Sequence, residues 1–129
     1  MAPRPVVLDT NFLLIPFRFR IDILKELDYL IEASHRFVVS SMSISELKKI
    51  AERIGKHGMA ARLALKLVEA NSKKIDIVDS KGYVDDWIVG YAEENNAIVC
   101  TNDSKLRRRL RELDIKVVTL KSKSKLGFV

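Results

Sequence analysis

The chain has 129 residues, of which 47% are hydrophobic and 31% are charged, and this amount of apolar material suffices for one compact core without a second domain. No apolar run approaches the roughly 20 residues that span a bilayer, and the N-terminus lacks the apolar stretch of a secretory signal, so we expect a soluble, cytoplasmic protein. The 23 Lys and Arg residues outnumber the 17 Asp and Glu residues. The resulting net charge of +6 favours a polyanionic partner, and charge alone does not separate nucleic acid from an acidic membrane surface.

The first forty residues alternate between apolar runs and a helical pattern. Residues 5–9, Pro-Val-Val-Leu-Asp, form a short β-branched run that predicts a buried strand ending at Asp9. From Asp22, an N-cap residue type, apolar residues recur at helical spacing and predict an amphipathic helix over residues 22 to about 34. Residues 36–40 return to the composition of a strand.

Two glycines interrupt the longest helical pattern of the chain. Ser43 and Glu46 have the spacing of a capping box, which predicts that a second helix begins near Ser43. Gly55 and Gly58 are expected to break it, and a helix resumes and continues to Asn71. The apolar positions of that continuation recur at helical spacing: Met59, Leu63, Leu67 and Ala70.

The second half of the chain continues the alternation. Strands are expected at 74–78, 97–100 and 115–120, with a turn at Gly82. One helix has the stripe Val84, Trp87, Ile88, Tyr91 and Ala92, and another follows a cap at Asp103 with the stripe Leu106, Leu110 and Leu113. We expect one domain over residues 1–120 and a loosely held basic tail over residues 121–129.

Strands that alternate with helices predict the α/β class, here a three-layer α/β/α fold around a mainly parallel sheet. In such sheets the ligand site lies outside the carboxyl ends of the strands. Asp9 ends the first strand and Asp103 follows the strand 97–100, while Glu46 and Asp85 lie in the first turns of helices that begin at the same edge. Four acidic residues from distant parts of the chain are therefore expected to converge.

Converging carboxylates repel one another, and a bound cation removes that repulsion. Oxygen-only ligands suit Mg²⁺ or Mn²⁺, which retain several waters and bind substrate phosphate. The two histidines, His35 and His57, belong to no Cys/His spacing, so zinc is not expected. Cys100 lies in an apolar run and is interpreted as a buried, inert thiol. The pattern therefore favours metal-dependent hydrolysis of phosphodiesters.

Four segments resemble the signature segments of PIN-domain ribonucleases: Val-Leu-Asp9-Thr-Asn11, Ser-Glu46-Leu, Val-Asp85-Asp86-Trp-Ile and Val-Cys-Thr101-Asn102-Asp103. The resemblance covers the chain from about Val6 to Leu120. It implies an endoribonuclease in which Asp9, Asp85 and Asp103 bind metal and Glu46 binds metal or positions water. It also implies supporting polar residues: Asn11, Thr101, Asn102 and Asp86. The segment from Asp9 to Phe17, the segment from Thr101 to Leu110 and the lysine-rich tail resemble the small-subunit rRNA-processing branch of the family.

Each acidic residue also has a purely structural interpretation, and for Asp9 it is the cap of a turn. Glu46 is explained by the capping box alone, and Asp103 by its position in the first turn of a helix. Asp85 and Asp86 both suit a helix N-terminus, and physical chemistry does not decide which faces the site, although the family pattern favours Asp85. Trp87, with Ile88 and Tyr91 on the same stripe, is interpreted as core rather than as a base-stacking platform.

Basic residues cluster beside the predicted site, and they suggest contact with RNA phosphates. The alternative is the solvated face of a helix. The residues are Arg18, Arg20, Lys105, Arg107, Arg108, Arg109, Arg111, Lys121, Lys123 and Lys125. Phe17 and Phe19 lie among them, and either base stacking or burial accounts for them.

Three other functions are compatible with the sequence. The first is a non-catalytic RNA- or ribosome-binding scaffold with the same fold, and the second is the toxin of a toxin–antitoxin pair. The third is a phospho-acceptor receiver domain with Asp79 and Lys121 as its site, which leaves Asp85 and Asp103 unexplained. The partners expected for the nuclease are RNA, with rRNA as one candidate, a ribosome-assembly factor or antitoxin, and a second copy in a homodimer.

Overall fold

The computed structural model describes residues 2–129 and places six strands of that part in one sheet of order β3-β2-β1-β4-β5-β6. The first five are parallel, and β6 is antiparallel to β5. Their bounds are β1 Arg4–Leu8, β2 His35–Ser40, β3 Ile75–Val78, β4 Ile98–Cys100, β5 Val117–Ser122 and β6 Lys125–Phe128. The predicted α/β class and mainly parallel sheet are confirmed.

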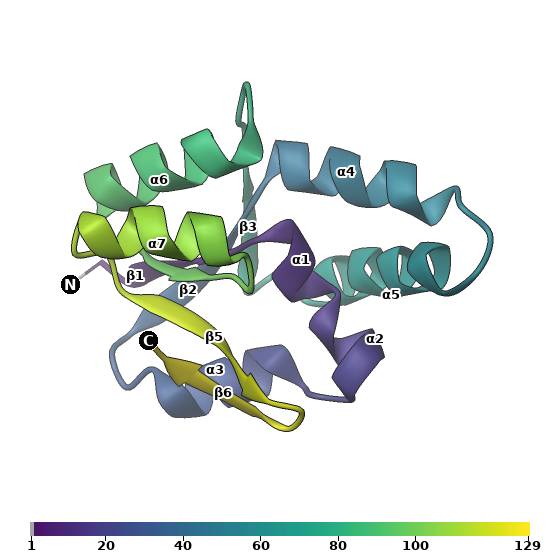
Figure 1. The fold of residues 1–129 in the computed structure, drawn as a ribbon, viewed down its shortest axis with the longest axis horizontal. Coiled ribbons are helices and arrows are strands. Elements are labelled where there is room, and N and C mark those ends of the chain that lie inside the picture. Colours follow the sequence, from purple (N-terminus) through teal and green to yellow (C-terminus); the bar gives the residue numbers. More distant parts are fainter. Residues whose placement is uncertain (1) are drawn as a thin grey trace.

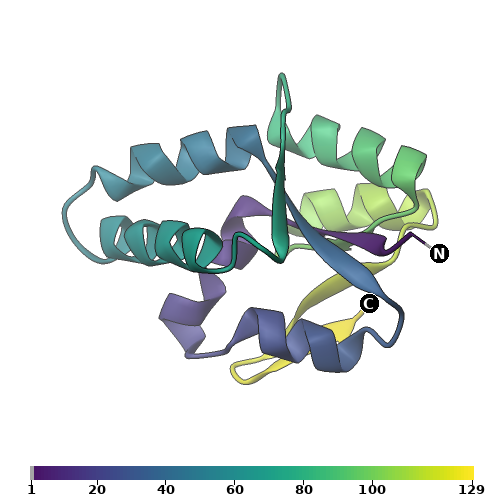
Figure 2. The ribbon, with the colours of Figure 1, turned by 180° about the vertical axis from the view of Figure 1, so that it is seen from behind.

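Helices cover both faces of this sheet (Figures 1 and 2). They are α1 Thr10–Leu13, α2 Ile15–Phe19, α3 Ile23–Leu30, α4 Ser41–Ala51, α5 Lys56–Ala70, α6 Val84–Asn95 and α7 Ser104–Glu112. One core contains residues of α1 to α5, and the other contains residues of α6 and α7. The central strand β1 contributes Val6 and Leu8 to the first core and Val7 to the second, because side chains alternate along a strand. The fold is therefore three-layered.

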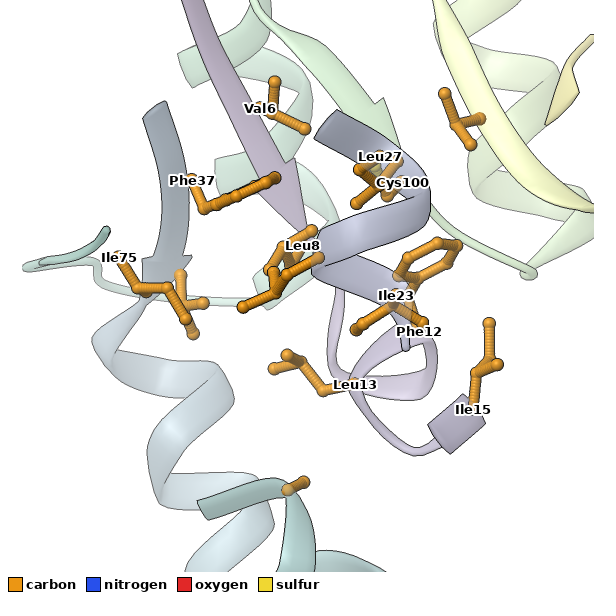
Figure 3. Close-up of a cluster of buried hydrophobic side chains, with 14 of the residues drawn as sticks. Val6, Leu8, Phe12, Leu13, Ile15, Ile23, Leu27, Phe37, Ile75 and Cys100 are labelled. Carbon is orange, nitrogen blue, oxygen red and sulfur yellow. The ribbon is translucent and has the colours of Figure 1, made fainter. Parts of the chain in front are cut away.

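The first core fixes the end of β1, where the predicted site begins. Leu8 and Phe12 are fully buried on either side of Asp9, and Figure 3 shows them beside Ile23 and Leu27 of α3. Cys100, at the end of β4, lies in the same cluster. Burial raises the pKa of the Cys100 thiol, as expected for an inert side chain. The backbone at the carboxyl ends of β1 and β4 is thus held by close packing.

Residues 10–19 form two short helices, for which we predicted no element. Pro16 lies at the beginning of α2, where its missing N–H costs nothing. Phe12 and Ile15 are buried, and Phe19 packs against the core, so the residues form this structure through tertiary packing rather than through an amphipathic repeat. Helix α3 has the predicted cap, Asp22, which accepts a hydrogen bond from Lys25 N at 3.2 Å, but ends at Leu30.

The second helix begins earlier than predicted. Its N-cap is Ser40, whose Oγ accepts a hydrogen bond from Ser43 N at 3.0 Å, so the predicted capping box at Ser43 and Glu46 is wrong. Gly55 separates α4 from α5, but Gly58 lies inside α5. Glycine suits this position because a Cβ would overlap the backbone carbonyl of Arg53, in the loop that joins the two helices. Glu46 is therefore not used to cap its helix.

The face of α5 that is buried is only partly the predicted one. Small residues, Ala60, Ala61 and Ala64, are buried with Val68, which lets α5 pack closely on α4. Met59 and Leu63 of the predicted stripe are 48% and 44% exposed. The predicted stripe is therefore only partly correct, because Leu67 packs against the core while Met59 and Leu63 do not, and the alanines supply much of the core contact.

The residues predicted as a loosely held tail form part of the sheet. Strand β5 continues to Ser122, and β6 returns beside it with Leu126 buried. The predicted boundary at residue 120 therefore falls within a strand. Leu113, predicted to be buried, is 44% exposed because α7 ends at Glu112. No helix within residues 2–129 is long and apolar enough to cross a membrane.

Candidate active site

Four acidic side chains line one cavity of about 270 Å³ at the carboxyl edge of the sheet: Asp9, Glu46, Asp85 and Asp103. The cavity is also lined by Thr10, Asn11, Leu14, Ile50 and Val84. They come together because β1, β2, β3 and β4 are parallel, so the helices that follow these strands begin at the same edge. Of the described residues that line the cavity, none is basic. The predicted convergence of the acids on a common cavity is confirmed.

Asp9 is the most buried of these acids, at 4% exposed. It follows β1 directly and is the N-cap of α1. Thr10 N–H donates to its Oδ1 at 2.8 Å, and the Thr101 hydroxyl donates to its Oδ2 at 2.7 Å. Burial nevertheless raises the pKa of Asp9 to about 6, and the negative charges of Asp85 and Glu46 add to the increase. The two hydrogen bonds oppose this shift.

Glu46 and Asp85 share this electrostatic environment. Burial raises the pKa of both carboxyl groups. The charge of Asp85 raises the pKa of Glu46 further, while Lys49 lowers it. The charge of Asp103 raises the pKa of Asp85 in the same way, while Arg109 lowers it. Neighbouring negative charges therefore add to the effect of burial on the pKa values of Asp9, Glu46 and Asp85, and a bound cation would relieve this repulsion.

Asp103 combines the two roles that were alternatives in the sequence. Its Oδ1 accepts hydrogen bonds from Lys105 N at 2.8 Å and Leu106 N at 3.0 Å, so it is the N-cap of α7. It also lines the acidic cavity. Its backbone N–H donates to the Thr101 hydroxyl at 3.0 Å, and that hydroxyl donates in turn to Asp9. Thr101 therefore joins two of the acids through one side chain.

The other predicted supporting residues link the cavity to the sheet. Asn11 Oδ1 accepts a hydrogen bond from Asn102 N at 3.1 Å. Asn102 Oδ1 accepts from the Thr119 hydroxyl at 3.0 Å and from Leu120 N at 3.1 Å, which ties the loop after β4 to β5. Asp86 does not belong to this set. It points away from the cavity and pairs with Arg109 at 2.9 Å, so Asp85 is the member of the pair that faces the site.

A hydroxyl network beside the cavity was not predicted. The Thr10 hydroxyl donates to Ser43 Oγ at 2.9 Å, and the Ser40 hydroxyl donates to the same oxygen at 3.0 Å. All three side chains are buried, and they join the start of α1 to the start of α4. Thr10 lies between two predicted site residues, Asp9 and Asn11, and this position could have indicated its role. Ser43 was interpreted as a helix cap, so its contact with Thr10 was not predicted.

The donor set of the cavity suits a hard divalent cation. It offers carboxylate oxygens, and the mutual repulsion of those groups is relieved by positive charge. Within residues 2–129, however, no three acidic, histidine or cysteine side chains are close enough to hold an ion together. The prediction that all four acids ligate directly is thus not supported by their spacing. The arrangement fits an ion such as Mg²⁺ that is bound by one or two carboxylates and keeps several waters.

The predicted basic residues differ in their exposure and in the contacts that they make. Arg108 and Arg111 are exposed and line a shallow cavity on α7 together with Ser104, Arg107 and Glu112. Arg107 donates weakly to the Thr119 hydroxyl at 3.4 Å, and Arg109 is paired with Asp86. Arg18, Arg20, Lys105, Lys121, Lys123 and Lys125 are exposed. Phe17 is partly buried and lines an apolar cavity against α5, which favours the structural interpretation of this residue.

The fold and the four acids define the class of protein. A family model described as "PIN like domain" matches residues 6–123, and the chain belongs to this family. Ribonuclease VapC4 of Methanocaldococcus jannaschii is 33% identical over 120 residues, which cover 92% of this chain and 91% of the relative. The rRNA-processing protein FCF1 of Saccharomyces cerevisiae is 27% identical over 113 residues, covering 86% of this chain and 56% of the relative.

A solved structure supports the same assignment. The PIN domain endonuclease Utp24 superimposes with a TM-score of 0.79 at 25% identity, and the match covers 98% of this chain and 91% of that structure. The receiver-domain alternative is wrong, because the chain belongs to another family. The topology also opposes it, since Asp79 follows β3, which is an edge strand rather than a central one.

Proposed function

We propose that this chain is a divalent-metal-dependent endoribonuclease that hydrolyses RNA phosphodiesters at the acidic cavity. The observation that supports it best is the convergence of four carboxylates on a cavity without basic lining residues, among the residues described. The pKa values of three of them, Asp9, Glu46 and Asp85, are raised by burial and by neighbouring negative charge. Family membership supports the same reaction, because relatives of this chain include a ribonuclease and a PIN domain endonuclease. Mg²⁺ and Mn²⁺ are the ions that this oxygen-only donor set favours.

In this proposal each acid has a separate task. Asp9 and Asp85 would hold the ion, with Asp103 as a further acidic group beside it, and the Thr101 hydroxyl keeps Asp9 oriented. A divalent ion at this position supplies charge neutralisation for the phosphoryl oxygens and an acidified water. Glu46 accepts the proton of the attacking water, because its raised pKa makes it a stronger base than an exposed glutamate. The apolar side chains of Leu14, Ile50 and Val84 limit access of bulk water to one side of the cavity.

Metal removal tests this function directly. We expect purified protein to cleave a structured RNA in Mg²⁺ or Mn²⁺, and we expect EDTA to abolish cleavage until excess metal is restored. Calorimetric titration with Mn²⁺ at low salt should show saturable binding. Binding of RNA without any cleavage in either metal would instead identify the chain as a non-catalytic scaffold.

Ribosomal RNA is the substrate class that we propose. Its support is the likeness to FCF1, which is named as an rRNA-processing protein. The test compares cleavage of small-subunit rRNA fragments with cleavage of unrelated RNA of the same length. Equal rates on both would contradict a role in rRNA processing and would favour a less selective ribonuclease such as a toxin.

The exposed face of α7 is expected to bind the RNA backbone. Arg108 and Arg111 lie one turn apart on this helix, which begins directly after Asp103. Replacing both by alanine should reduce the slope of log K against log salt concentration by about 1.4, because each phosphate contact with a single strand contributes about 0.7. Fluorescence anisotropy with labelled RNA at several salt concentrations measures this slope.

The matched control for α7 is Lys116→Ala. Lys116 is exposed but precedes β5, so it lies at the opposite edge of the sheet from the acidic cavity. The control should leave the salt slope unchanged. If Lys116→Ala reduced the salt slope equally, RNA binding would depend on the net charge of the chain and not on the surface of α7.

A further inference from the structure

The loop over residues 79–83, which joins β3 to α6, projects past α4 and α6 in both views of the fold (Figures 1 and 2). Its base is fixed to the beginning of α4. Ser80 N–H donates to Ser41 Oγ at 2.9 Å, and Ser80 Oγ accepts from Met42 N at 3.1 Å. Gly82 has a φ of +77°, which favours glycine and turns the chain toward α6. The loop is therefore anchored at Ser80 and projects from the edge of the site.

This projection presents an aromatic ring to solvent. Tyr83 is 82% exposed, and although it is the N-cap residue of α6 its side chain makes no capping hydrogen bond. The next two residues, Val84 and Asp85, line the acidic cavity. Two residues extend the chain by at most about 7 Å, so the ring is attached beside the position where a phosphate would be cleaved. Lys81, on the same loop, is also exposed.

We propose that Tyr83 forms a nucleobase-stacking subsite beside the acidic cavity, with Lys81 contacting a neighbouring phosphate. The proposal rests on the proposed function, since it places a base of the RNA next to the phosphodiester that is hydrolysed. Proteins recognise single-stranded RNA by stacking unpaired bases on exposed aromatic side chains, and such stacking tolerates any base because each has a π face. The subsite therefore selects an unpaired nucleotide at the cleavage position.

The test uses a short single-stranded RNA that carries 2-aminopurine, whose fluorescence is quenched when it stacks. The protein carries Asp9→Asn to stop cleavage, and Mg²⁺ is present. We expect saturable quenching, and we expect Tyr83→Ala to remove it and weaken binding by about tenfold. Tyr83→Phe should retain both, because the ring is kept. Tyr83→Leu should behave like Tyr83→Ala, since leucine is apolar but has no π face.

The control is Tyr29→Ala. Tyr29 is 89% exposed on α3, which belongs to the core on the other face of the sheet from α6, and its loss should change neither quenching nor affinity. Full affinity and quenching in Tyr83→Ala would overturn the proposal. So would an equal loss in Tyr83→Phe, which would assign recognition to the hydroxyl group, or full affinity in Tyr83→Leu, which would indicate an apolar contact.

Failure of the subsite and failure of the proposed function give different results. Quenching that depends on Tyr83, in a protein whose unmodified form cleaves no RNA in either metal, supports the subsite and contradicts the nuclease. Cleavage by the unmodified protein without any dependence of quenching on Tyr83 supports the nuclease and overturns the subsite. Circular dichroism of each variant shows whether it is folded, which we expect because Tyr83 is exposed.

Discussion

Asp9→Asn is expected to reduce RNA cleavage at least about 100-fold, which is the scale of losing one positioned acid–base or electrostatic group. Asp9 is the most buried acid of the cavity, and both of its oxygens are oriented by hydrogen bonds from Thr10 and Thr101. Asparagine has nearly the same shape but carries no charge, so it weakens metal binding without emptying the position. Initial rates at saturating Mg²⁺ measure the effect.

The same variant should be more stable than the unmodified protein when metal is absent. The pKa of Asp9 rises from 3.8 to about 6 on folding, so the folded state binds the proton more tightly than the unfolded state between these pH values. Stability of the unmodified protein in EDTA therefore falls as pH rises from about 4 to about 6, by on the order of 3 kcal/mol from this group. Asparagine does not ionise, so it removes this loss, but it weakens the hydrogen bonds at this position by about 1 kcal/mol. We expect a net gain on the order of 1–2 kcal/mol at pH 7.

Asp86→Asn is the matched control for this experiment. Asp86 is an acid on the same edge of the molecule, but it is exposed and paired with Arg109 outside the cavity. Its neutralisation should leave cleavage within about twofold and should not change the pH profile of unfolding, because exposed ion pairs contribute little. A large loss of cleavage in Asp86→Asn, or full cleavage in Asp9→Asn, would contradict the assignment of the site.

The positions of the acids were predictable because they depend on topology. Asp9 follows an apolar strand, and the alternation of strands and helices predicts a parallel sheet, so the edge at which the acids meet follows from the pattern alone. The choice between Asp85 and Asp86 was not predictable by physical chemistry, since both suit the first turn of α6. It depends on the pairing of Asp86 with Arg109, a contact between residues 23 positions apart.

The errors lie where tertiary contacts override a local pattern. Ser43 was interpreted as a cap, but its hydroxyl accepts hydrogen bonds from Thr10 and Ser40. The apolar stripe with Met59 and Leu63 predicted the buried face of α5, yet the side chains buried there are mainly alanines together with Val68. The polar segment near the C-terminus predicted a tail, but β6 pairs with β5 and its Leu126 is buried in the core. The contact between Ser40 and Ser43 is local, but Thr10 and Ser43 are 33 positions apart, and Leu126 is buried in a core that also contains residues of α3.

The close contact of Gly58 with the loop that joins α4 to α5 leads to the largest expected loss of stability, in Gly58→Ala. A Cβ at this position would overlap the backbone carbonyl of Arg53 and would lie 3.1 Å from Arg62 Nη1. The Arg62 side chain is itself held by Ala51 O at 2.7 Å, so it has little freedom to move. Backbone must shift to admit the methyl group, and we expect a loss of about 2–3 kcal/mol in the free energy of unfolding.

Gly90→Ala separates this packing effect from the general preference of helices for alanine. A Cβ at Gly90 meets no described atom within 4 Å, and the residue is exposed in α6, so the substitution should stabilise the protein by about 0.5–1 kcal/mol. Urea unfolding in EDTA measures both variants. Helix α4 carries Glu46 and Ile50, which line the cavity, so a shift of this helix should also lower RNA cleavage by folded Gly58→Ala. Gly90→Ala should cleave RNA at the normal rate. If both variants were stabilised, the loop that joins α4 to α5 would be able to move at little cost. The contact at Gly58 would then not determine the position of α4.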